Sequence, residues 1–302
     1  MTSSVHKNTT NSNNIQLLSL NVRGLRDASK RAQIFNWMKQ YHNASKSFVF
    51  LQETHSVPTD ETKWQAEWGS KIMFDHGSAN KAGVAIMFPS NNNGDDAKVI
   101  TQKSNGRKLG VSIKLNDAEY FLLNVYGPTQ DKKDEQAKFL DSLKDVFESR
   151  RDQIDKFIIG GDFNLYLNPA LDKDKNAKST DVSERMRNLI DEFSLIDIWR
   201  TKNPELKRYT WRRNKPIVQS RLDYWFIPFE LSYMVESTKI VPGLKTDHSL
   251  ISLVLKFSNN SNRGPGLWKF NSDLLKYEDY CDGIKYMYIL KTETDIEEME
   301  QK

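Results

Sequence analysis

Short apolar runs alternate with longer amphipathic stretches along residues 15–257, and this pattern predicts an α/β fold. The runs Ile15 to Val22 and Phe48 to Leu51 are rich in branched and aromatic residues, which is typical of buried strands. Residues 26–42 between them carry apolar side chains at helical spacing, so the domain is expected to begin with a strand, a helix and a second strand. Further strands are expected over residues 71–75, 82–88, 108–115, 120–125, 157–159, 221–227 and 250–255.

Two later stretches are amphipathic with the period of an α-helix. Residues 132–151 and residues 179–194 each carry their apolar side chains on one helical face, so both are predicted to be helices. Residues 209–220 have strand-like ends around a short polar segment that contains Pro216. They are therefore predicted to form a β-hairpin.

The two ends of the chain differ in composition from the part between them. Residues 1–14 are polar and rich in Ser, Thr and Asn, and they are expected to be disordered. Residues 258–302 are expected to be a linker followed by a tail that is too short for a second core. One domain is therefore expected over residues 15–257. The chain has no apolar run long enough to span a bilayer and no apolar signal core, so we expect neither membrane insertion nor secretion.

Charge and cysteine content narrow the classes of function. The formal net charge of +4 and the isoelectric point of about 8.8 permit a polyanionic partner such as nucleic acid without requiring one. Cys281 is the one cysteine in the sequence, so neither an intramolecular disulfide nor a cysteine-rich zinc site can form.

Polar side chains gather at the ends of the predicted strands. The segment from Gly160 to Asn164 follows the strand over residues 157–159, and its two glycines end that strand. If the chain stays extended there, Asp162 and Asn164 project to one side and Phe163 projects to the other. Such a segment is by itself also an ordinary turn. Similar polar residues follow other strands: Asn21, Glu53, Tyr126, and Asp247 with His248.

The kinds of side chain at these strand ends suit a hard divalent cation. Three carboxylates with amides and no thiol are typical of Mg²⁺ sites, and a histidine without a second histidine at metal spacing argues against zinc. Asp223 is expected to hydrogen-bond His248 and to fix its tautomer. The residues alone also allow structural roles: a turn at Asn21, a packing aromatic at Tyr126, a core ion pair of Asp223 with Arg221 or Arg208, and a loop cap at Asp247-His248.

Six segments together resemble the exonuclease-endonuclease-phosphatase superfamily, which includes exonuclease III, apurinic endonucleases and DNase I. They occur in the order found in that superfamily, each at an expected strand end, and the resemblance covers residues 15–257. It implies a four-layer α/β sandwich, DNase I-like, with two mixed β-sheets packed face to face and helices outside. The segments are Ser19-Leu20-Asn21-Val22, Leu51-Gln52-Glu53-Thr54, Asn124-Val125-Tyr126-Gly127-Pro128, Gly160-Gly161-Asp162-Phe163-Asn164, Ser220-Arg221-Leu222-Asp223-Tyr224 and Thr246-Asp247-His248-Ser249.

Within that superfamily the chain is most similar to the endonuclease domain of LINE-type non-LTR retrotransposon polyproteins. The features are Gln52-Glu53-Thr54-His55, Tyr209-Thr210-Trp211 and the segment from Arg263 to Asn271. In that family the nuclease nicks chromosomal DNA, and the freed 3′-hydroxyl primes reverse transcription. The resemblance implies duplex DNA as the partner, the nucleus as the site of action, and continuation of the natural polyprotein into a reverse transcriptase.

The resemblance also implies roles for the polar residues at the strand ends. Glu53 matches the main metal ligand, helped by Asn21, and Asp247 matches a second carboxylate of the metal site. Asp162 matches the residue that orients or deprotonates the attacking water, and Asn164 aligns that residue. The cation is expected to be Mg²⁺, with Mn²⁺ as a substitute.

The remaining roles concern phosphate and DNA. His248 is implied to contact the scissile phosphate while Asp223 holds it, and Tyr126 is implied to stabilise the phosphate or the leaving oxygen. Arg23 stands where many apurinic endonucleases have an acid, which argues against a two-metal arrangement and makes Arg23 a candidate phosphate contact. DNA binding is expected around the basic hairpin. The expected DNA contacts are Arg23, Thr210, Trp211, Arg212, Arg213, Ser220, Arg221 and Thr246.

The expected function is a Mg²⁺-dependent endonuclease that nicks duplex DNA and leaves 3′-hydroxyl and 5′-phosphate ends. Two alternatives stay open. One is a stand-alone apurinic/apyrimidinic repair endonuclease, and the other is a catalytically silent DNA-binding module, against which the filled catalytic positions argue. The basic hairpin disfavours a phospholipid or inositol-phosphate phosphodiesterase.

Overall fold

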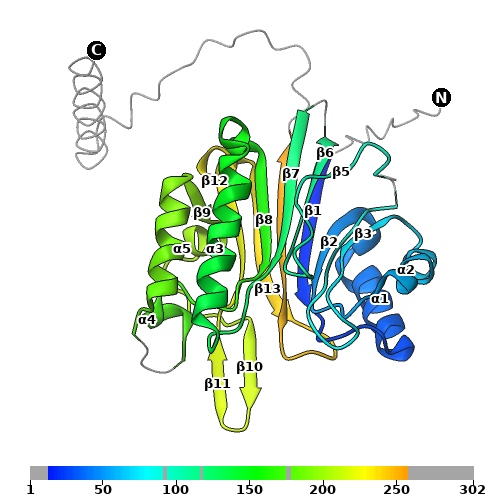
Figure 1. Ribbon diagram of the computed structural model, residues 1–302, viewed down its shortest axis with the longest axis horizontal. Coiled ribbons are helices and arrows are strands. Elements are labelled where there is room, and N and C mark those ends of the chain that lie inside the picture. Colours follow the sequence, from blue (N-terminus) through cyan, green and yellow to red (C-terminus); the bar gives the residue numbers. More distant parts are fainter. Residues whose placement is uncertain (1–12, 91–93, 116–117, 175–177, 258–302) are drawn as a thin grey trace, which may run out of the picture. The chain divides into compact units, whose positions relative to one another are not determined.

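Two six-stranded β-sheets pack face to face in the computed structural model of this protein, which describes residues 13–90, 94–115, 118–174 and 178–257 (Figure 1). Of the segment predicted to be disordered, residues 1–14, all but the last two residues lie outside the described residues, and so do the predicted linker and tail at 258–302. β1 begins at Asn13, which pairs with Phe257 of the last strand. The regular structure therefore starts two residues before the predicted boundary at Ile15.

The first sheet has the strand order β13-β14-β1-β2-β4-β3. β1 and β2 run parallel and are joined through α1 (Ala28–His42), so the predicted strand, helix and strand at the start of the domain are present. The other neighbouring pairs are antiparallel. The strands are β1 (Asn13–Asn21), β2 (Ser47–Gln52), β3 (Ile72–Asp75), β4 (Val84–Met87), β13 (Val235–Pro242) and β14 (Ser249–Phe257).

The second sheet has the strand order β5-β6-β7-β8-β12-β9. β7 and β8 run parallel because α3 (Lys133–Glu148) connects them, and the remaining pairs are antiparallel. The strands are β5 (Lys98–Val99), β6 (Lys108–Leu115), β7 (Ala118–Tyr126), β8 (Phe157–Asp162), β9 (Leu195–Asp197) and β12 (Asp223–Pro228).

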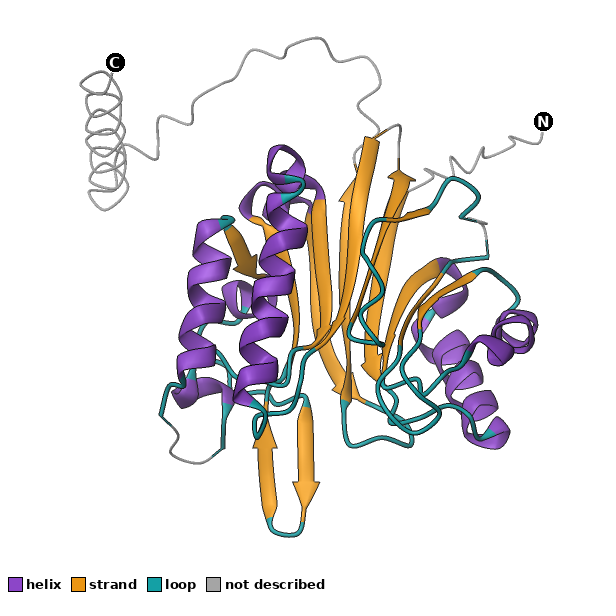
Figure 2. Ribbon diagram, viewed as in Figure 1, coloured by secondary structure: helices purple, strands orange, loops and turns teal. Residues whose placement is uncertain are grey.

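Helices cover the outer faces of both sheets, as Figure 2 shows. α1 and α2 share one apolar core with the first sheet, and α3 and α5 share another with the second sheet. The predicted four-layer sandwich is therefore confirmed. The remaining elements are α2 (Glu61–Trp68), α4 (Pro169–Asp172), α5 (Asp181–Glu192), α6 (Ile198–Lys202), η1 (Ala44–Lys46), η2 (Pro58–Asp60), η3 (Arg151–Lys156) and η4 (Phe229–Met234).

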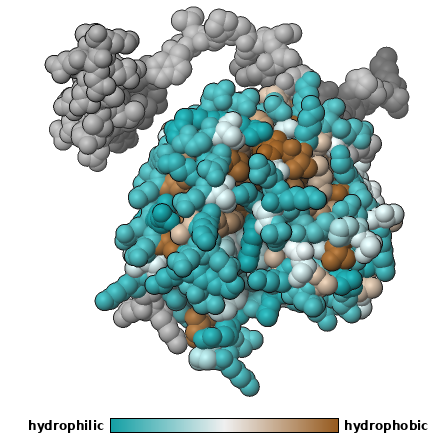
Figure 3. All heavy atoms as spheres, in the orientation of Figure 1, coloured by the Kyte–Doolittle hydropathy of each residue, from teal (hydrophilic) through white to brown (hydrophobic). Residues whose placement is uncertain are grey.

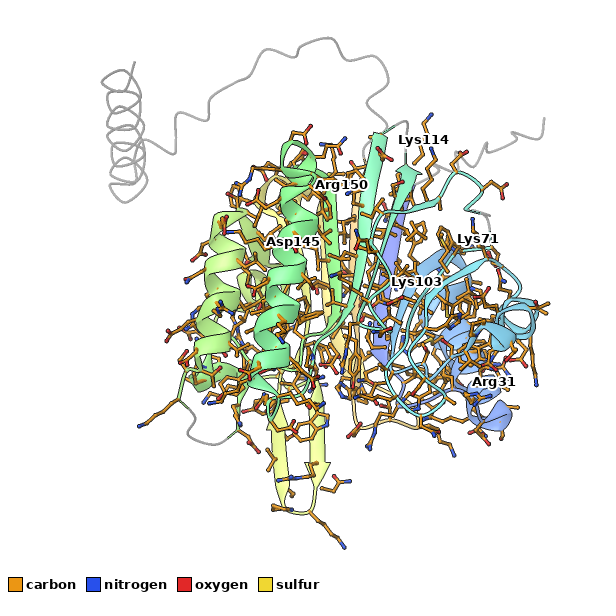
Figure 4. The ribbon with its side chains drawn as sticks, in the orientation of Figure 1. Arg31, Lys71, Lys103, Lys114, Asp145 and Arg150 are labelled. Carbon is orange, nitrogen blue, oxygen red and sulfur yellow. The ribbon has the colours of Figure 1, made fainter. Side chains whose placement is uncertain are left out.

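The core between the sheets explains one of the two glycines in the Gly160-Gly161 pair. Trp225 on β12 packs against Phe50 on β2, with ring centroids 5.2 Å apart across the interface. A Cβ atom at Gly160 would lie 2.2 Å from the Trp225 ring, so a larger residue there would push the tryptophan out of the core. On the outer face of the first sheet, buried Arg31 of α1 pairs with Glu67 of α2 and ties the two helices together (Figure 4).

A two-stranded hairpin, β10 (Trp211–Asn214) and β11 (Ile217–Ser220), projects beyond the sandwich (Figure 1). It agrees with the hairpin predicted for residues 209–220, and its strands pair with each other and not with either large sheet. Across the described ranges, we find no helix with the length and apolar character needed to cross a membrane.

Candidate active site

The ends of the central strands bring the predicted polar residues to one edge of the sandwich. β7 and β8 place Tyr126 beside Asp162, and β8 and β12 place Asp162 beside Asp223. In the other sheet, parallel β1 and β2 end together, with Asn21 on β1 and Glu53 directly after β2. Side chains that are far apart in the sequence therefore meet where parallel strands end, which is the usual place for a site in an α/β fold.

His248 is buried between two carboxylates. Its Nδ1 atom lies 3.0 Å from Asp223 Oδ2, and its Nε2 atom lies 3.8 Å from Asp162 Oδ2. The predicted hydrogen bond with Asp223 is therefore present. Burial alone would lower the pKa of His248, but Asp223 and Asp162 outweigh burial and raise this pKa to about 9. The imidazole is a cation at neutral pH, and its Nε2–H is available to a ligand because Asp223 holds Nδ1.

Asp162 is 1% exposed and accepts hydrogen bonds on both oxygens. Oδ2 accepts from Asn21 Nδ2 and Oδ1 accepts from the backbone N–H of Asn164, each at 2.9 Å. Burial, and after it the charge of Asp223, raise the pKa of Asp162 to about 7, although His248 and the two hydrogen bonds act in the opposite direction. Asp162 therefore exchanges a proton near neutral pH, which is the property that a general base needs.

Glu53 stands beside this group with one oxygen engaged. Oε1 accepts from Asn21 Nδ2 at 2.9 Å and from the Tyr126 hydroxyl at 2.8 Å. The imidazole of His55 lies near Oε2, with its Nε2 atom at 3.8 Å, which is too long for a hydrogen bond. Burial and the charge of Glu53 raise the pKa of Tyr126, so the phenol stays protonated and can donate.

Asp247 lines the same cleft as Glu53 and also has one engaged oxygen. Oδ2 accepts from Arg23 NH1 at 2.9 Å and from Trp211 Nε1 at 3.0 Å. Oδ1 is buried and has no hydrogen-bond partner among the described residues. Such an orphaned carboxylate oxygen is costly unless a cation or a water binds it. Thr246 supports this loop, because its hydroxyl donates to the carbonyl of Asn21 at 2.8 Å.

The donors in the cleft fit a hard cation. Glu53, Asp247, Asn164 and His248 line one cleft of about 560 Å³. The two carboxylates contribute the under-coordinated oxygens, Glu53 Oε2 and Asp247 Oδ1, and a wide cleft leaves room for the waters that Mg²⁺ retains. Glu53 and Asp247 are therefore the residues of this cleft that could hold such an ion.

A second set of metal-ligating atoms exists within the described residues, formed by Asp162, Asp223 and His248 within 4.8 Å of one another. All three side chains are buried, and the histidine already binds Asp223 through Nδ1. The Asp162 carboxylate also accepts from Asn21 and from the backbone of Asn164, so most polar atoms of this trio are already engaged within the protein. This trio is consequently better suited to proton transfer and hydrogen bonding than to metal binding.

The hairpin presents a different face to each of two cavities. Alternate residues of a paired strand point to opposite sides. Arg213 and Val218 line the catalytic cleft, whereas Arg212 and Gln219 line a second cavity of about 420 Å³ with Lys207 and Arg208. Hydrophilic side chains dominate the protruding hairpin in the space-filling view (Figure 3). Arg212 and Arg213 are exposed and have no ion-pair partner in the described ranges, so both remain available to phosphate.

The expected DNA contact of Arg221 is not compatible with its position. Arg221 is 1% exposed, and its guanidinium donates to Asp172 at 2.8 Å and to Asp197 at 2.6 Å. Trp199 and Tyr224 also contact the guanidinium, with ring centroids 5.2 Å and 4.4 Å from its central carbon. Arg221 belongs to an internal ion-pair network because the buried Asp172 and the partly buried Asp197, both far away in the sequence, lie against it.

Thr210 and Ser220 also differ from the expectation of DNA contacts. The Thr210 hydroxyl is buried and accepts from the backbone N–H groups of Leu222 and Asp223, at 2.9 Å and 3.1 Å. It therefore fixes the start of β12 and the position of Asp223. Ser220 lines the catalytic cleft but is 3% exposed. Trp211 lines the same cleft and uses its indole N–H on Asp247, so one edge of its ring is already engaged.

The backbone at Asn164 is not extended, so the predicted alternation of side chains ends at Phe163. Asn164 has φ of 51°, in the left-handed region that asparagine tolerates better than most residues. Its side-chain amide donates to the carbonyl of Gly127 at 2.9 Å, and its backbone N–H reaches Asp162. The residue still lies beside Asp162, but a turn places it there and not a strand.

Two polar residues that support the site, Asn124 and Arg107, were not identified from the sequence. Asn124 joins the sheets, because it accepts from Gln52 Nε2 at 2.7 Å and donates to the carbonyls of Leu51 and Ala85. Its place in the segment before Tyr126 was a usable signal. Arg107 lies 4.7 Å from the Tyr126 ring centroid, and nothing in the sequence around it marks this contact.

Comparisons with known proteins agree with this geometry. Residues 18–233 match the model of the Endonuclease/Exonuclease/phosphatase family. The chain is 32% identical over 275 residues to the transposon TX1 uncharacterized 149 kDa protein of Xenopus laevis. That match covers 90% of this chain and 20% of the Xenopus protein, so the chain spans about a fifth of the length of this relative. The predicted resemblance to transposon-encoded nucleases is confirmed.

Solved structures with the same fold include three nucleases of low sequence identity. An AP endonuclease of Leishmania major gives a TM-score of 0.68 at 17% identity, covering 81% of this chain and 88% of that one. The 3′ phosphatase NExo of Neisseria gives 0.65 at 16% identity, covering 80% and 100%. The endonuclease domain of TRAS1, a telomere-specific non-LTR retrotransposon, gives 0.57 at 14% identity, covering 81% and 99%.

Proposed function

Because this chain belongs to the Endonuclease/Exonuclease/phosphatase family and is therefore a metal-dependent phosphodiesterase, we propose that its substrate is duplex DNA and its metal is Mg²⁺. The observation that carries the proposal is the position of the basic hairpin. Arg213 lines the same cleft as His248, Glu53 and Asp247. A phosphodiester bound by the hairpin therefore reaches the reactive groups without any rearrangement of the fold.

The side chains that line the cleft and those buried directly beside them divide the work of hydrolysis. Asp162, with a pKa of about 7, takes a proton from the attacking water. His248 is cationic and donates from Nε2 to a nonbridging oxygen of the phosphate, while Asp223 holds the ring in place. The protonated Tyr126 hydroxyl, which donates to Glu53 in this structure, would turn to donate to the leaving oxygen. Asn21 links Asp162 to Glu53, because one amide group donates to both carboxylates.

A divalent ion bound by Glu53 and Asp247 would neutralise charge on the phosphate and on the leaving oxygen. The all-oxygen donor set supports Mg²⁺, and Mn²⁺ is expected to substitute because it accepts the same ligands. The products are a 5′-phosphate and a 3′-hydroxyl.

The biological role that we propose is the nick that primes target-primed reverse transcription at a chromosomal site in the nucleus. Similarity to the Xenopus transposon protein, of which this chain spans a fifth, supports a longer natural polyprotein. Similarity in fold to the TRAS1 endonuclease domain supports a nuclease module of a retrotransposon. The reverse transcriptase that would extend the nick belongs to the same proposal.

A second candidate is an apurinic/apyrimidinic repair endonuclease, favoured by the fold similarity to the Leishmania AP endonuclease. The two candidates make different demands on the substrate. A repair enzyme cleaves abasic DNA in strong preference to intact duplex, whereas a retrotransposon nuclease nicks intact duplex. Comparing initial rates on one duplex with and without a single abasic residue decides between them.

The test of the proposed activity is conversion of supercoiled plasmid to the open-circular form with Mg²⁺. The variants Asp162→Ala and His248→Ala should lose this activity, and Asp141→Ala, an exposed carboxylate on α3, should keep it. Extension of the nicks by a DNA polymerase without prior phosphatase treatment reports the free 3′-hydroxyl. Persistent nicking by both catalytic variants would contradict the assignment, and a wild-type protein that binds DNA but never nicks it would be a silent binding module.

A further inference from the structure

The loop that carries Glu53 has an unusual backbone. Glu53 has φ of 50° and His55 has φ of 55°, so two non-glycine residues lie in the left-handed region on either side of Thr54. Side chains other than glycine and asparagine rarely adopt this conformation, and it persists where surrounding contacts hold it. The direction in which Glu53 leaves the backbone therefore depends on what holds this loop.

Backbone hydrogen bonds hold the loop from two sides. The carbonyls of Glu53 and Thr54 accept from Gly24 and Leu25, at 2.6 Å and 3.0 Å. On the other side, the N–H of Thr54 donates to the carbonyl of Gly83 at 3.0 Å. The fit around the Thr54 hydroxyl is tight, because a Cβ atom at Gly83 would lie 2.4 Å from it.

A chain of four side chains ties the same loop to β3 and α2. The Thr54 hydroxyl lies 2.9 Å from the Ser56 hydroxyl, and the Ser56 hydroxyl lies 2.9 Å from His76 Nδ1. His76 Nε2 in turn lies 2.8 Å from the carboxylate of Glu61. Thr54 and Ser56 are fully buried, while Glu61 is partly exposed at the start of α2. The chain therefore runs from the protein surface to the residue directly after Glu53.

The chemistry of the four groups gives this chain one consistent direction when the imidazole is neutral. A carboxylate only accepts, so His76 donates from Nε2 to Glu61 and its Nδ1 is left as an acceptor. Ser56 then donates to Nδ1 and accepts from Thr54. The hydroxyls of Thr54 and Ser56 each donate one hydrogen bond, and each donor in the chain meets an acceptor. The loop is therefore held by a hydrogen-bond network with one consistent direction. The His76 ring also stacks on Phe74, with centroids 5.1 Å apart, which fixes its plane.

We propose that Ser56 and His76 are positioning residues for Glu53: the Thr54–Ser56–His76–Glu61 chain keeps the Glu53 loop in its left-handed conformation and so sets the affinity for the divalent ion. This inference rests on the proposed function, because it takes Glu53 as a metal ligand. Neither Ser56 nor His76 touches the cleft, and neither lines it. Their contribution is the orientation of a ligand, an effect that typically changes metal affinity by about 10-fold to 100-fold.

The test measures Mn²⁺ binding by isothermal titration calorimetry on the full chain without DNA. Ser56→Ala removes the middle of the chain. His76→Gln keeps a donor near the Nε2 position for Glu61 and loses the contact with Ser56, whereas His76→Asn keeps an acceptor near Nδ1 for Ser56 and loses Glu61. Ser56→Ala and His76→Gln, which break the chain next to the Glu53 loop, should weaken Mn²⁺ binding about 10-fold, and His76→Asn, which keeps the link to Ser56, should bind Mn²⁺ more tightly than His76→Gln.

Two controls separate this role from general damage. His42→Gln changes a histidine that contacts Trp37 on α1, and it should bind Mn²⁺ like the wild type. Thermal unfolding of each variant checks that the fold is intact. Unchanged Mn²⁺ affinity in Ser56→Ala and His76→Gln would overturn the proposal, and so would equal losses in His76→Asn and His76→Gln. A Glu53→Ala protein that still binds Mn²⁺ normally would refute the premise. Failure of the proposed function shows separately, as absence of plasmid nicking by the wild type.

Discussion

Replacing Asp223 by asparagine tests how the protein keeps His248 charged. Asp223 lies 3.0 Å from His248 Nδ1 and is the largest of the influences that raise the pKa of His248 to about 9 against the effect of burial. Asp223→Asn keeps the size of the side chain but removes its negative charge, so the pKa of His248 falls to its ordinary value of 6.5 or below. At pH 8 the protonated fraction of the ring then drops from about 90% to about 3%, roughly a 30-fold loss of the active form.

The pH dependence of nicking reports this change directly. The wild type needs Asp162 deprotonated and His248 protonated, so its rate should rise through about pH 7 and fall through about pH 9. In Asp223→Asn the alkaline fall should move at least two pH units toward acid, and the rate at pH 8 should fall about 30-fold. Asp145→Asn, an exposed carboxylate on α3 that Figure 4 labels, should keep the wild-type profile. An Asp223→Asn protein with the wild-type alkaline limb would refute the reasoning.

Three other results are expected. Arg213→Ala should reduce nicking of single-stranded and duplex DNA alike, because Arg213 lines the catalytic cleft. Arg212→Ala, on the opposite face of the hairpin, should reduce duplex binding more than Arg213→Ala does. Each variant should lower the salt slope of duplex binding by about one, measured by fluorescence anisotropy at several KCl concentrations. Arg221→Met should cost up to about 3–5 kcal/mol in the free energy of unfolding, measured by urea denaturation, because the buried Asp172 keeps only Arg200 as an ion-pair partner and the partly buried Asp197 loses its ion pair; a stable variant that only loses DNA affinity would contradict this. EDTA should abolish nicking, and Mg²⁺ or Mn²⁺ should restore it; undiminished nicking in EDTA would refute the metal assignment.

The composition of the site could be predicted from the sequence because one physical rule governs it. Apolar runs become central strands, and the residues after parallel strands share an edge of the sandwich. Asn21, Glu53 and Asp162 follow such runs, so their convergence could be anticipated. The antiparallel register that puts Asp223 beside Asp162 depends on how β12 docks on β8, and no local pattern encodes it.

The errors of prediction have a common cause, which is that charge and polarity do not reveal their surroundings. Arg221 lies near a run of exposed basic residues, and only the tertiary positions of Asp172 and Asp197 show that it is buried. α2 was missed because its eight residues bury only Trp64 and Trp68, too few for a periodic signal. The polar edge strand β13 and the short strands β5 and β9 were missed for similar reasons.

The contact between Trp211 and Asp247 has a consequence for engineering. The indole N–H of the hairpin binds a carboxylate of the cleft, and the backbones are also joined, by Arg212 to Asp247 and by Ser249 to Thr210. If the hairpin were replaced by one from another nuclease to change the cleavage site, the position of Asp247 in the cleft would also change unless residues 210 and 211 were kept. The side chains of residues 212 to 219 take no part in these contacts, so they can be exchanged while the links that hold Asp247 stay in place.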